Sequence, residues 1–310
     1  MIPFLIGIPA VLAVVFQIVR NEKIRGYIVY AGAGAIMAMT VVFIADWIGG
    51  GAKTWMFYPR TETIDHLMTA GDIFLMCLIV WLSVRYKRVL PMILSILQTV
   101  LVLYVEFTAE VTEGPHMMVD WLTILMCIII AFIGGFICIY TVGYMKGYHQ
   151  HHKDVKDRQP FFFSMLFLFL AAMFGLVLSQ NLIWIYFFWE ITSVISFLMI
   201  GYTRTEEAVG NSFCALWMNL LGGLGFAIAI VLMALGQESL QLTEVVSTGA
   251  LLPLMCLSLA GLTKSAQLPF STWLLGAMVA PTPSSALLHS ATMVKAGVYL
   301  LIRISPAFSG

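Results

Sequence analysis

The chain has 310 residues, of which 61% are hydrophobic and 10% are charged, and its mean hydropathy is +0.95. This composition excludes a soluble globular domain and is typical of a membrane protein. Because 16 basic and 16 acidic side chains balance each other, the overall charge gives no indication of a nucleic-acid partner.

Apolar runs long enough to cross a hydrocarbon core as helices follow one another along the sequence, about ten in all. They cover Ile2–Val19, Gly26–Ile48, Ala70–Val84, Val89–Phe107, Trp121–Tyr140, Phe161–Leu178, Leu182–Ile200, Asn211–Leu235, Leu251–Ala280 and Pro283–Ile304. The first run has neither a basic leader nor a small-residue cleavage site, so we interpret it as a retained helix. The sequence therefore predicts an all-α polytopic membrane protein.

Basic side chains in the short loops predict how the chain is oriented in the membrane. The first, third and fifth loops are basic, whereas the fourth, EFTAEVTEGPH, is acidic and the eighth has no basic residue. We therefore expect the odd loops on the cytoplasmic side of the cell membrane and the N-terminus on the outer side. Arg303 fits this scheme poorly, because it would lie at the outer side.

Cysteine and histidine positions give no indication of a resident metal or cofactor. The five cysteines (Cys77, Cys127, Cys138, Cys214 and Cys256) lie in apolar runs without the tight spacing of cluster ligands. No carboxylate or thiol repeats at ligand spacing around the histidines of GYHQHHKDVKDRQ, so a solvated polar loop is favoured over a metal site. We expect no cofactor and no metal in this chain.

Charged side chains inside the apolar runs are the candidate functional groups. An ionised side chain at mid-bilayer costs roughly 2.5–3.5 kcal/mol, so such residues face water or a partner. Glu190, in LIWIYFFWEITSVISFLMI, has too short a stem to reach the membrane surface, and Lys264 lies in LAGLTKSAQLPFSTW. We interpret both as functional. His289 and Lys295, in SSALLHSATMVKAGVYLLI, are candidates for which helix packing or snorkelling is an equal alternative.

Pro269 lies inside the ninth apolar run, five residues after Lys264. Proline removes a backbone donor and clashes with the preceding turn, so the helix is expected to break there. Broken helices inside membranes line cavities or meet ions. A carboxylate, a lysine and an imidazole near one hydrated break are groups suited to moving protons.

Three motifs, FFWEITSVISFLMIGY, LTKSAQLPFSTWLLGAMVAPTPSSALLHSATMVKAGVYLLIR and IYTVGYMKGY, resemble the antiporter-like subunits shared by complex I, energy-converting membrane-bound hydrogenases and Mrp-type cation/proton antiporters. The similarity extends from Val119 to Arg303. We therefore divide the chain into N-terminal transmembrane helices, 1–118, in which the spans between Ala70 and Phe107 resemble a two-helix insertion, and an antiporter-like proton-translocating repeat, 119–310.

The resemblance implies a half-channel of five helices around a broken one, in which a carboxylate–lysine pair drives proton movement. Glu190 matches the glutamate of the family's W-E motif, and Lys264 matches the lysine of K-S-A-Q. His289 matches the histidine after P-T-P, and Lys295 the lysine of M-V-K-A-G. Asp120 matches the acidic residue that opens the helix before G-Y-M, to which we assign a structural role.

Two departures from the family pattern bear on function. NLLGGLGF has Gly222 and Gly223 where complex I members usually place an aspartate after a glycine, which is closer to the hydrogenase and Mrp branches. The family also continues into an inverted second repeat, which is absent here. We expect another chain or segment to supply that second half-channel.

Two functions stay open on the sequence. The favoured one is an H⁺- and/or Na⁺-translocating, non-redox subunit of a complex-I-type redox pump such as a membrane-bound hydrogenase. Its peripheral redox partners would hold iron–sulfur clusters, with a nickel–iron centre in a hydrogenase. The alternative is a component that resembles the large A-type subunit of a stand-alone Mrp-type Na⁺/H⁺ antiporter. Lipid and other membrane subunits are expected partners in both cases.

Overall fold

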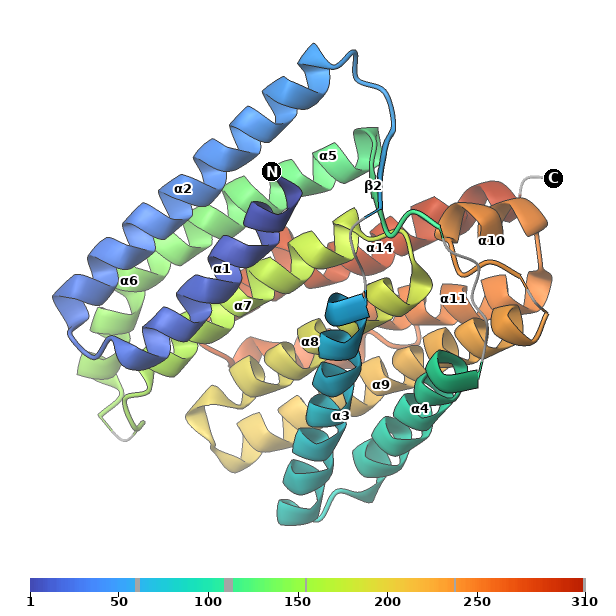
Figure 1. Ribbon diagram of the computed structural model, residues 1–310. Coiled ribbons are helices and arrows are strands. Elements are labelled where there is room, and N and C mark those ends of the chain that lie inside the picture. The colour runs from blue at the N-terminus through green and yellow to red at the C-terminus, as the bar shows by residue number, and fades with distance from the viewer. Residues whose placement is uncertain (59–61, 109–113, 154, 237, 309–310) are drawn as a thin grey trace.

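The computed structural model describes residues 1–58, 62–108, 114–153, 155–236 and 238–308 (Figure 1). Most of these residues are helical. The α-helices are α1 (Ile2–Ile18), α2 (Glu22–Gly49), α3 (Glu62–Arg85), α4 (Val89–Thr108), α5 (Trp121–Ile128), α6 (Gly135–His151), α7 (Gln159–Leu178), α8 (Leu182–Ile200), α9 (Glu206–Leu235), α10 (Leu242–Thr248), α11 (Leu251–Lys264), α12 (Thr272–Gly276), α13 (Thr282–Ala286) and α14 (Met293–Ile304).

Wider or tighter helical turns join several of these helices. The π-helical segments Ile129–Gly134 and Leu287–Ala291 connect α5 to α6 and α13 to α14. Short 3₁₀ segments are Gly201–Thr203, Ala277–Val279 and Ser305–Phe308. Strands β1 (Trp55–Phe57) and β2 (Met117–Val119) pair antiparallel, with Trp55 opposite Val119.

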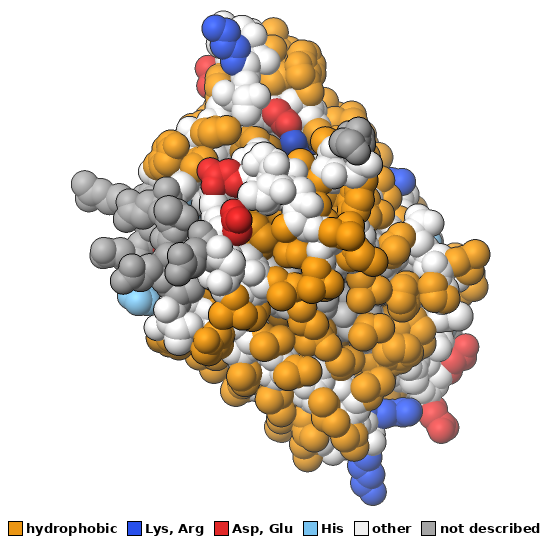
Figure 2. All heavy atoms as spheres, turned by 90° about the vertical axis from the view of Figure 1, so that its right-hand side faces the viewer, with side chains coloured by type: hydrophobic (Ala, Val, Ile, Leu, Met, Phe, Trp, Pro, Cys, Tyr) orange, Lys and Arg blue, Asp and Glu red, His pale blue; other side chains and the backbone are white. Residues whose placement is uncertain are grey.

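The predicted all-α polytopic membrane fold is confirmed. Among the described residues, eight helices are long and apolar enough to cross a membrane, and the shorter apolar helices α1 and α11 occupy the first and ninth expected spans. Figure 2 shows the resulting surface: hydrophobic side chains cover a broad middle band, and the charged side chains in view lie above and below it. This distribution is expected where acyl chains surround the middle of a protein and water its two ends.

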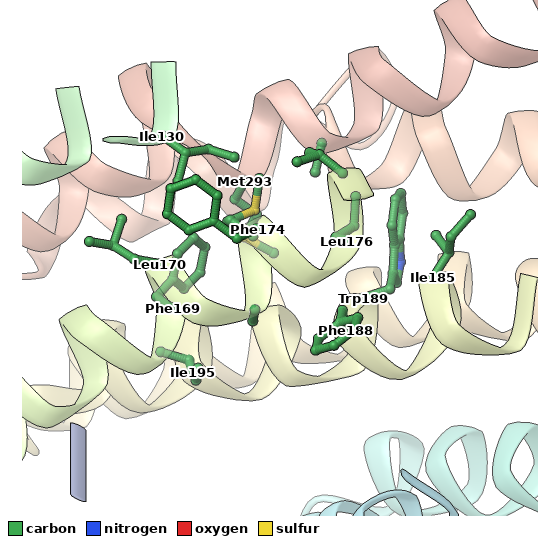
Figure 3. Close-up of a cluster of buried hydrophobic side chains, with 14 of the residues drawn as sticks. Ile130, Phe169, Leu170, Phe174, Leu176, Ile185, Phe188, Trp189, Ile195 and Met293 are labelled. Carbon is green, nitrogen blue, oxygen red and sulfur yellow. The ribbon is translucent and has the colours of Figure 1, made fainter. Parts of the chain in front are cut away.

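Helices α7 and α8 form the centre of the molecule. In their apolar windows 89% and 78% of the residues are buried, so these two helices face protein rather than lipid. Large side chains of both, including Phe169, Phe174 and Trp189, interlock in one hydrophobic cluster (Figure 3). These two helices belong to a closed series of contacts: α7 packs against α8, α8 against α9, α9 against α11, α11 against α14, and α14 against α7. This closed ring is the expected five-helix unit.

The ninth span is broken, as the sequence predicts. Helix α11 ends at Lys264, the backbone turns through residues 265–271 around Pro269, and α12 begins only at Thr272. The indole of Trp273 donates a hydrogen bond of 2.9 Å to the Thr263 carbonyl, which the broken helix leaves without its usual partner. Lys264 is therefore the last residue of a helix that stops inside the protein.

Helices α3 and α4 form a hairpin that packs on each other and against α8 and α9, away from α1 and α2 (Figure 1). These are the two helices interpreted as an insertion, and the division of the chain at residues 118 and 119 stays a prediction. Helix α3 begins at Glu62, earlier than the expected Ala70. Hydropathy marks only the apolar part of a helix, so it missed the polar first turns that carry Asp65 and Thr69.

Two loops also differ from their expected form. The eighth contains α10, whose buried residues Leu242 and Val245 hold a short amphipathic turn against the protein. In the fifth, α6 extends to His151, and His149 contacts the hydroxyl of Tyr202 at 3.1 Å. No group of metal-ligating side chains occurs in the part of the chain that the structure describes.

Candidate ion-translocation site

Glu190 lies in the middle of α8 and is buried, with 3% of its surface exposed. Asn181 caps this helix by accepting a hydrogen bond of 2.8 Å from the Ile183 amide, so the apolar run that follows is helical from its start. The Oε2 atom of Glu190 accepts a hydrogen bond of 2.7 Å from the Gln98 amide of α4. Its Oε1 atom is buried and has no hydrogen-bond partner among the described residues.

Lys264 is fully buried at the C-terminal end of α11. Its ammonium group donates to the Trp189 carbonyl at 2.9 Å and to the Ser193 hydroxyl at 2.8 Å, and it lies 4.8 Å from the centre of the Trp189 ring. A helix C-terminus and an aromatic face both favour a cation. The ammonium is therefore held on the α8 turn that carries Glu190.

The predicted proximity of Glu190 and Lys264 is present, but the two do not form a direct ion pair. Within the described ranges, Arg303 forms an ion pair with Asp120 and His149 Nε2 lies 3.6 Å from Asp157 Oδ1, and neither contact includes the central pair. The charges of Glu190 and Lys264 nevertheless interact. Burial removes the hydration of both charges and so makes each costly. Because the two charges are opposite, each one stabilises the ionised form of the other.

Glycines of α9 let neighbouring helices approach this site. A Cβ atom at Gly223 would lie 2.5 Å from Glu190 Oε1 and 2.7 Å from Gln98 Oε1, and one at Gly222 would lie 1.9 Å from Thr263 Oγ1. The Gly222–Gly223 pair therefore makes room for Glu190 and for the last turn of α11.

The other two candidates, His289 and Lys295, are not joined to the central pair. His289 lies in the π-helical turn between α13 and α14, where its ring makes a hydrogen bond with the Leu274 backbone. Its Nε2 atom is buried without a partner in the described residues. Lys295 lies half-buried on α14. In the described part of the chain, no hydrogen bond or ion pair links either residue to Glu190 or Lys264.

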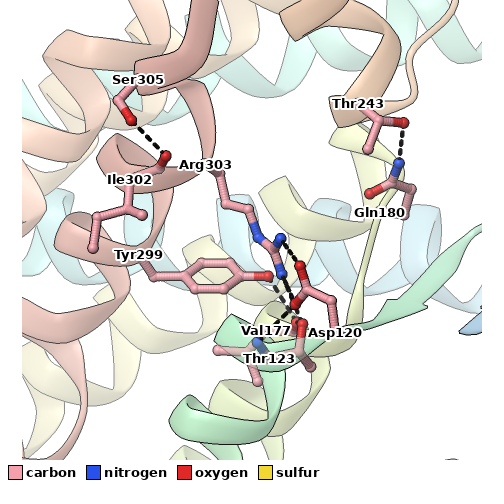
Figure 4. A network of polar contacts seen from close by, with 9 residues as sticks. All are labelled: Asp120, Thr123, Val177, Gln180, Thr243, Tyr299, Ile302, Arg303 and Ser305. Carbon is pink, nitrogen blue, oxygen red and sulfur yellow. Dashed lines mark hydrogen bonds and ion pairs between the residues drawn. The ribbon is translucent and has the colours of Figure 1, made fainter. Parts of the chain in front are cut away.

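Asp120 and Arg303 tie α5 to α14 (Figure 4). Asp120 caps α5 by accepting a hydrogen bond of 2.9 Å from the Thr123 amide. Arg303 pairs with both carboxylate oxygens, at 2.7 Å for Oδ1, and reaches the Thr123 hydroxyl at 2.8 Å. This fork geometry supports the structural role assigned to Asp120. It also explains why Arg303 departs from the charge pattern of the loops, because the Asp120 carboxylate neutralises its charge.

Protein-family models match two parts of the chain. One described as "NADH:quinone oxidoreductase/Mrp antiporter, TM" covers residues 179–310, and one described as "NADH-Ubiquinone oxidoreductase (complex I), chain 5 N-terminus" covers residues 114–154. The chain belongs to the antiporter-like membrane-subunit superfamily. Glu190, Lys264, His289 and Lys295 all lie within the first match.

Curated relatives of this antiporter-like protein include the A1 subunits of two Na⁺/H⁺ antiporters. That of Staphylococcus haemolyticus is 40% identical over 199 residues, and that of Staphylococcus aureus strain Newman is 37% identical over 199 residues. Each match covers 61% of this chain, which spans 24% of the relative's length. Among solved structures, the Mrp complex from Dietzia sp. DQ12-45-1b is 27% identical with a TM-score of 0.54, over 77% of this chain and 28% of the other.

A second structural neighbour shows the fold alone. The membrane-bound sulfane sulfur reductase, an archaeal respiratory membrane complex, matches at 16% identity with a TM-score of 0.54, covering 80% of this chain and 55% of the other. At this identity the similarity extends to the helical architecture and carries no information about the reaction.

Three residues around Glu190 were not among the candidates predicted from the sequence of this antiporter-like protein. Ser193 holds the Lys264 ammonium, Gln98 holds the Glu190 carboxylate, and Asp72 of α3 is a second buried carboxylate, with 4% of its surface exposed. The charge of Asp72 interacts with that of Glu190. Asp72 and Gln98 could have been found from the sequence, because each is a polar residue inside an apolar run, as Glu190 is. Both lie in the two spans that were interpreted as an insertion.

Proposed function

We propose that this protein translocates ions through a half-channel centred on Glu190 and Lys264, as a component similar to the A-type subunit of an Mrp-type Na⁺/H⁺ antiporter. The observation that carries the proposal is a buried lysine at the end of a broken helix, held on the helical turn that carries a buried glutamate. Such charges inside a membrane are costly and are kept where they move ions.

The geometry supports a two-state exchange at this site. When Glu190 is ionised, its charge attracts the Lys264 ammonium; when Glu190 is protonated, that attraction is lost and the Trp189 carbonyl and Ser193 hydroxyl hold the ammonium. Because α11 stops at Lys264, this end can shift without moving a continuous helix. Proton loading at Glu190 and displacement of Lys264 are thereby linked. His289 and Lys295 are proposed to extend the path beyond this pair.

The comparisons support the antiporter alternative more than the redox pump. The relatives at 37–40% identity are named Na⁺/H⁺ antiporter subunits, whereas the likeness to a respiratory complex is one of fold. Both matched structures are named as complexes, so we propose other membrane subunits as partners. Placement in the cell membrane with the N-terminus outward, and redox subunits carrying metal clusters, stay predictions.

Transport by two variants tests the proposal. Glu190→Gln keeps the shape of the side chain without a titratable charge, and Lys264→Met keeps the stem without the ammonium. In vesicles containing the assembled complex, we expect Na⁺-driven proton release to fall by roughly 100-fold or more, the loss typical of a proton-transfer group. Glu207→Gln, an exposed carboxylate at the start of α9, is the matched control. Normal exchange by Glu190→Gln, with normal co-purification of partners, would overturn the role given to the pair.

A further inference from the structure

A row of buried polar side chains occurs on the two helices of the otherwise apolar α3–α4 hairpin. Asp72 and Ser83 belong to α3, and Ser95, Gln98 and Thr99 belong to α4; each is at most 4% exposed. Asp72 and Ser83 are eleven residues apart, or three helical turns, so they lie on one face of α3. We call this row, together with Glu190 of α8, the polar seam.

Many polar atoms of the polar seam have no partner in the described part of the chain. Asp72 Oδ2, Ser83 Oγ, Ser95 Oγ, Gln98 Oε1 and Glu190 Oε1 are all buried without a hydrogen bond. A buried polar atom without a partner costs about 1–3 kcal/mol. Buried water bonds to otherwise unsatisfied groups, so five such atoms on the hairpin and on Glu190 indicate a hydrated seam.

Two of these atoms converge beside α9. Glu190 Oε1 and Gln98 Oε1 lie 2.5 Å and 2.7 Å from one point, the position of a Cβ atom on Gly223. Both are acceptors, and no donor from the described residues lies between them. A proton on Glu190, or a water molecule that donates to both oxygens, satisfies this arrangement. Glu190 Oε2 is therefore held by the Gln98 amide, while Oε1 is left to take a proton or to bind water.

The open end of the hairpin, where α3 begins and α4 ends, carries a third carboxylate. Glu106 Oε2 on α4 lies 2.9 Å from the Thr69 hydroxyl of α3, which also lies 2.9 Å from the Asp65 carbonyl oxygen. One hydroxyl hydrogen serves only one acceptor, so Glu106 either accepts it or, when protonated, donates to Thr69. This contact is compatible with both charge states of Glu106.

Asp72 interacts electrostatically with the two other carboxylates, Glu190 and Glu106. On α3, Thr69 and Asp72 are three residues apart and thus neighbours on one helix face. At the Glu106 end the Trp184 indole donates a hydrogen bond of 2.8 Å to Asp65 Oδ1, which fixes α3 to α8. The carboxylates thus follow the order Glu106, Asp72, Glu190 from the open end of the hairpin to the centre of the molecule.

We propose that the polar seam of the α3–α4 hairpin is a hydrated proton path to Glu190, with Asp72 as the carrier between Glu106 and Glu190. A proton leaves a Glu106 oxygen, passes through water to Asp72 Oδ2 and then to Glu190 Oε1, and each donor returns to its carboxylate form. Only O–H bonds form and break. The inference rests on the proposed function. Glu190 then receives protons from the hairpin and is coupled to the charge of Lys264.

The test compares Asp72 variants with the Glu190 variant in the same vesicles. We expect Asp72→Asn to slow Na⁺-driven proton release by at least roughly tenfold, and Asp72→Glu, which restores a titratable carboxyl, to recover most of the rate. Cys77→Ser, an exposed position on α3, is the matched control and should keep the wild-type rate. Dicyclohexylcarbodiimide, an apolar reagent for protonated carboxyls, should label Asp72 in the wild type, as read by mass spectrometry.

The outcomes separate this inference from the proposed function. Normal exchange by Glu190→Gln overturns the proposed function and the seam with it. Loss of exchange in Glu190→Gln together with a wild-type rate in Asp72→Asn overturns only the seam. Should Asp72→Asn fail to assemble, Glu106→Gln decides: the proposal requires slower exchange, and a wild-type rate refutes it. Slow exchange in both Asp72→Asn and Asp72→Glu with intact assembly would assign Asp72 a packing role and would also refute the path.

Discussion

Gly223 of α9 faces Glu190 of α8 so closely that a methyl group at position 223 would lie 2.5 Å from the Glu190 Oε1 atom. A glycine thus sets where the buried carboxylate rests. The same position also faces Gln98, whose amide donates the 2.7 Å hydrogen bond to the other oxygen of Glu190. Three helices, α4, α8 and α9, therefore determine the geometry of one carboxyl group.

Gly223→Ala should impair transport without unfolding the protein. The atoms that a Cβ would meet are the ends of flexible side chains, so Glu190 and Gln98 can move aside, but their hydrogen bond is then strained or lost. We expect exchange to fall by roughly tenfold, since 1.4 kcal/mol corresponds to tenfold and a hydrogen bond to a charged group contributes about 1.5–3 kcal/mol. Transport assays and thermal unfolding of the purified complex measure the two effects separately.

The adjacent glycine provides the contrast. A Cβ at Gly222 would lie 1.9 Å from Thr263 Oγ1 and 3.3 Å from the main-chain Cα of Ala260, so α9 and α11 must separate. Gly222→Ala is expected to lower stability as well as transport. Equal loss of stability in both variants would show that Gly223 acts through helix packing and not through Glu190.

Ser193→Ala should weaken the hold on Lys264. The hydroxyl accepts one of the two hydrogen bonds of the ammonium, at 2.8 Å, and the Trp189 carbonyl accepts the other. Because that bond stabilises one of the two proposed positions of the ammonium by about 1.5–3 kcal/mol, we expect exchange to slow by roughly tenfold or more. The control is Ser196→Ala, whose hydroxyl donates to the Ser193 carbonyl of its own helix. Similar rates in the two variants would argue against the contact.

Asp120→Asn should reduce stability in a pH-dependent way. Burial raises the pKa of the Asp120 carboxyl, but hydrogen bonds from Arg303 and from the Thr123 amide outweigh it, so the pKa lies below its ordinary value. A lowered pKa contributes stability above the unfolded-state value of about 3.9, and this contribution is lost as pH falls through the folded-state pKa.

At neutral pH we therefore expect Asp120→Asn to lose about 1.5–3 kcal/mol in the free energy of unfolding, the contribution of hydrogen bonds to a charged group. Its stability should also fall less than that of the wild type when the pH is lowered below about 4. Thermal unfolding across this pH range measures both effects. Asp46→Asn, an exposed carboxylate near the end of α2, is the control. An unchanged acid dependence in Asp120→Asn would contradict the assignment.

The apolar runs of the sequence located every long helix, because lipid requires long uncharged segments that satisfy their own backbone hydrogen bonds. The break at Pro269 and the functional weight of Glu190 and Lys264 were predictable for local reasons, a missing donor and a costly charge. The surroundings of Glu190 were not. Gln98 lies 92 residues from Glu190 in sequence, and no local pattern indicates that α4 packs on α9 and brings Gln98 to Glu190. Such pairings are decided by packing of the whole bundle.

Gly297→Ala should separate the two helices that meet behind Lys264. A Cβ at Gly297 of α14 would lie 2.5 Å from the Gly261 carbonyl oxygen and 2.6 Å from the Ser265 amide nitrogen, which are main-chain atoms of the break region. Main-chain atoms cannot rotate away as side chains do, so α11 and α14 must move apart. Small residues permit this kind of close helix crossing in membrane proteins.

We expect Gly297→Ala to cost about 1–3 kcal/mol, as overpacking of a tight core does, and to slow transport because Ser265 directly follows Lys264. Gly261→Ala should be milder, since its nearest neighbours are side-chain atoms of Leu301, at 2.7 Å and 2.8 Å. Gly143→Ala, on α6 with nothing within 4 Å of its Cβ position, should leave both properties unchanged. Thermal unfolding and vesicle exchange of the three variants test this order. If Gly297→Ala were as stable and as active as Gly143→Ala, the close crossing of α11 and α14 would not be what positions Lys264.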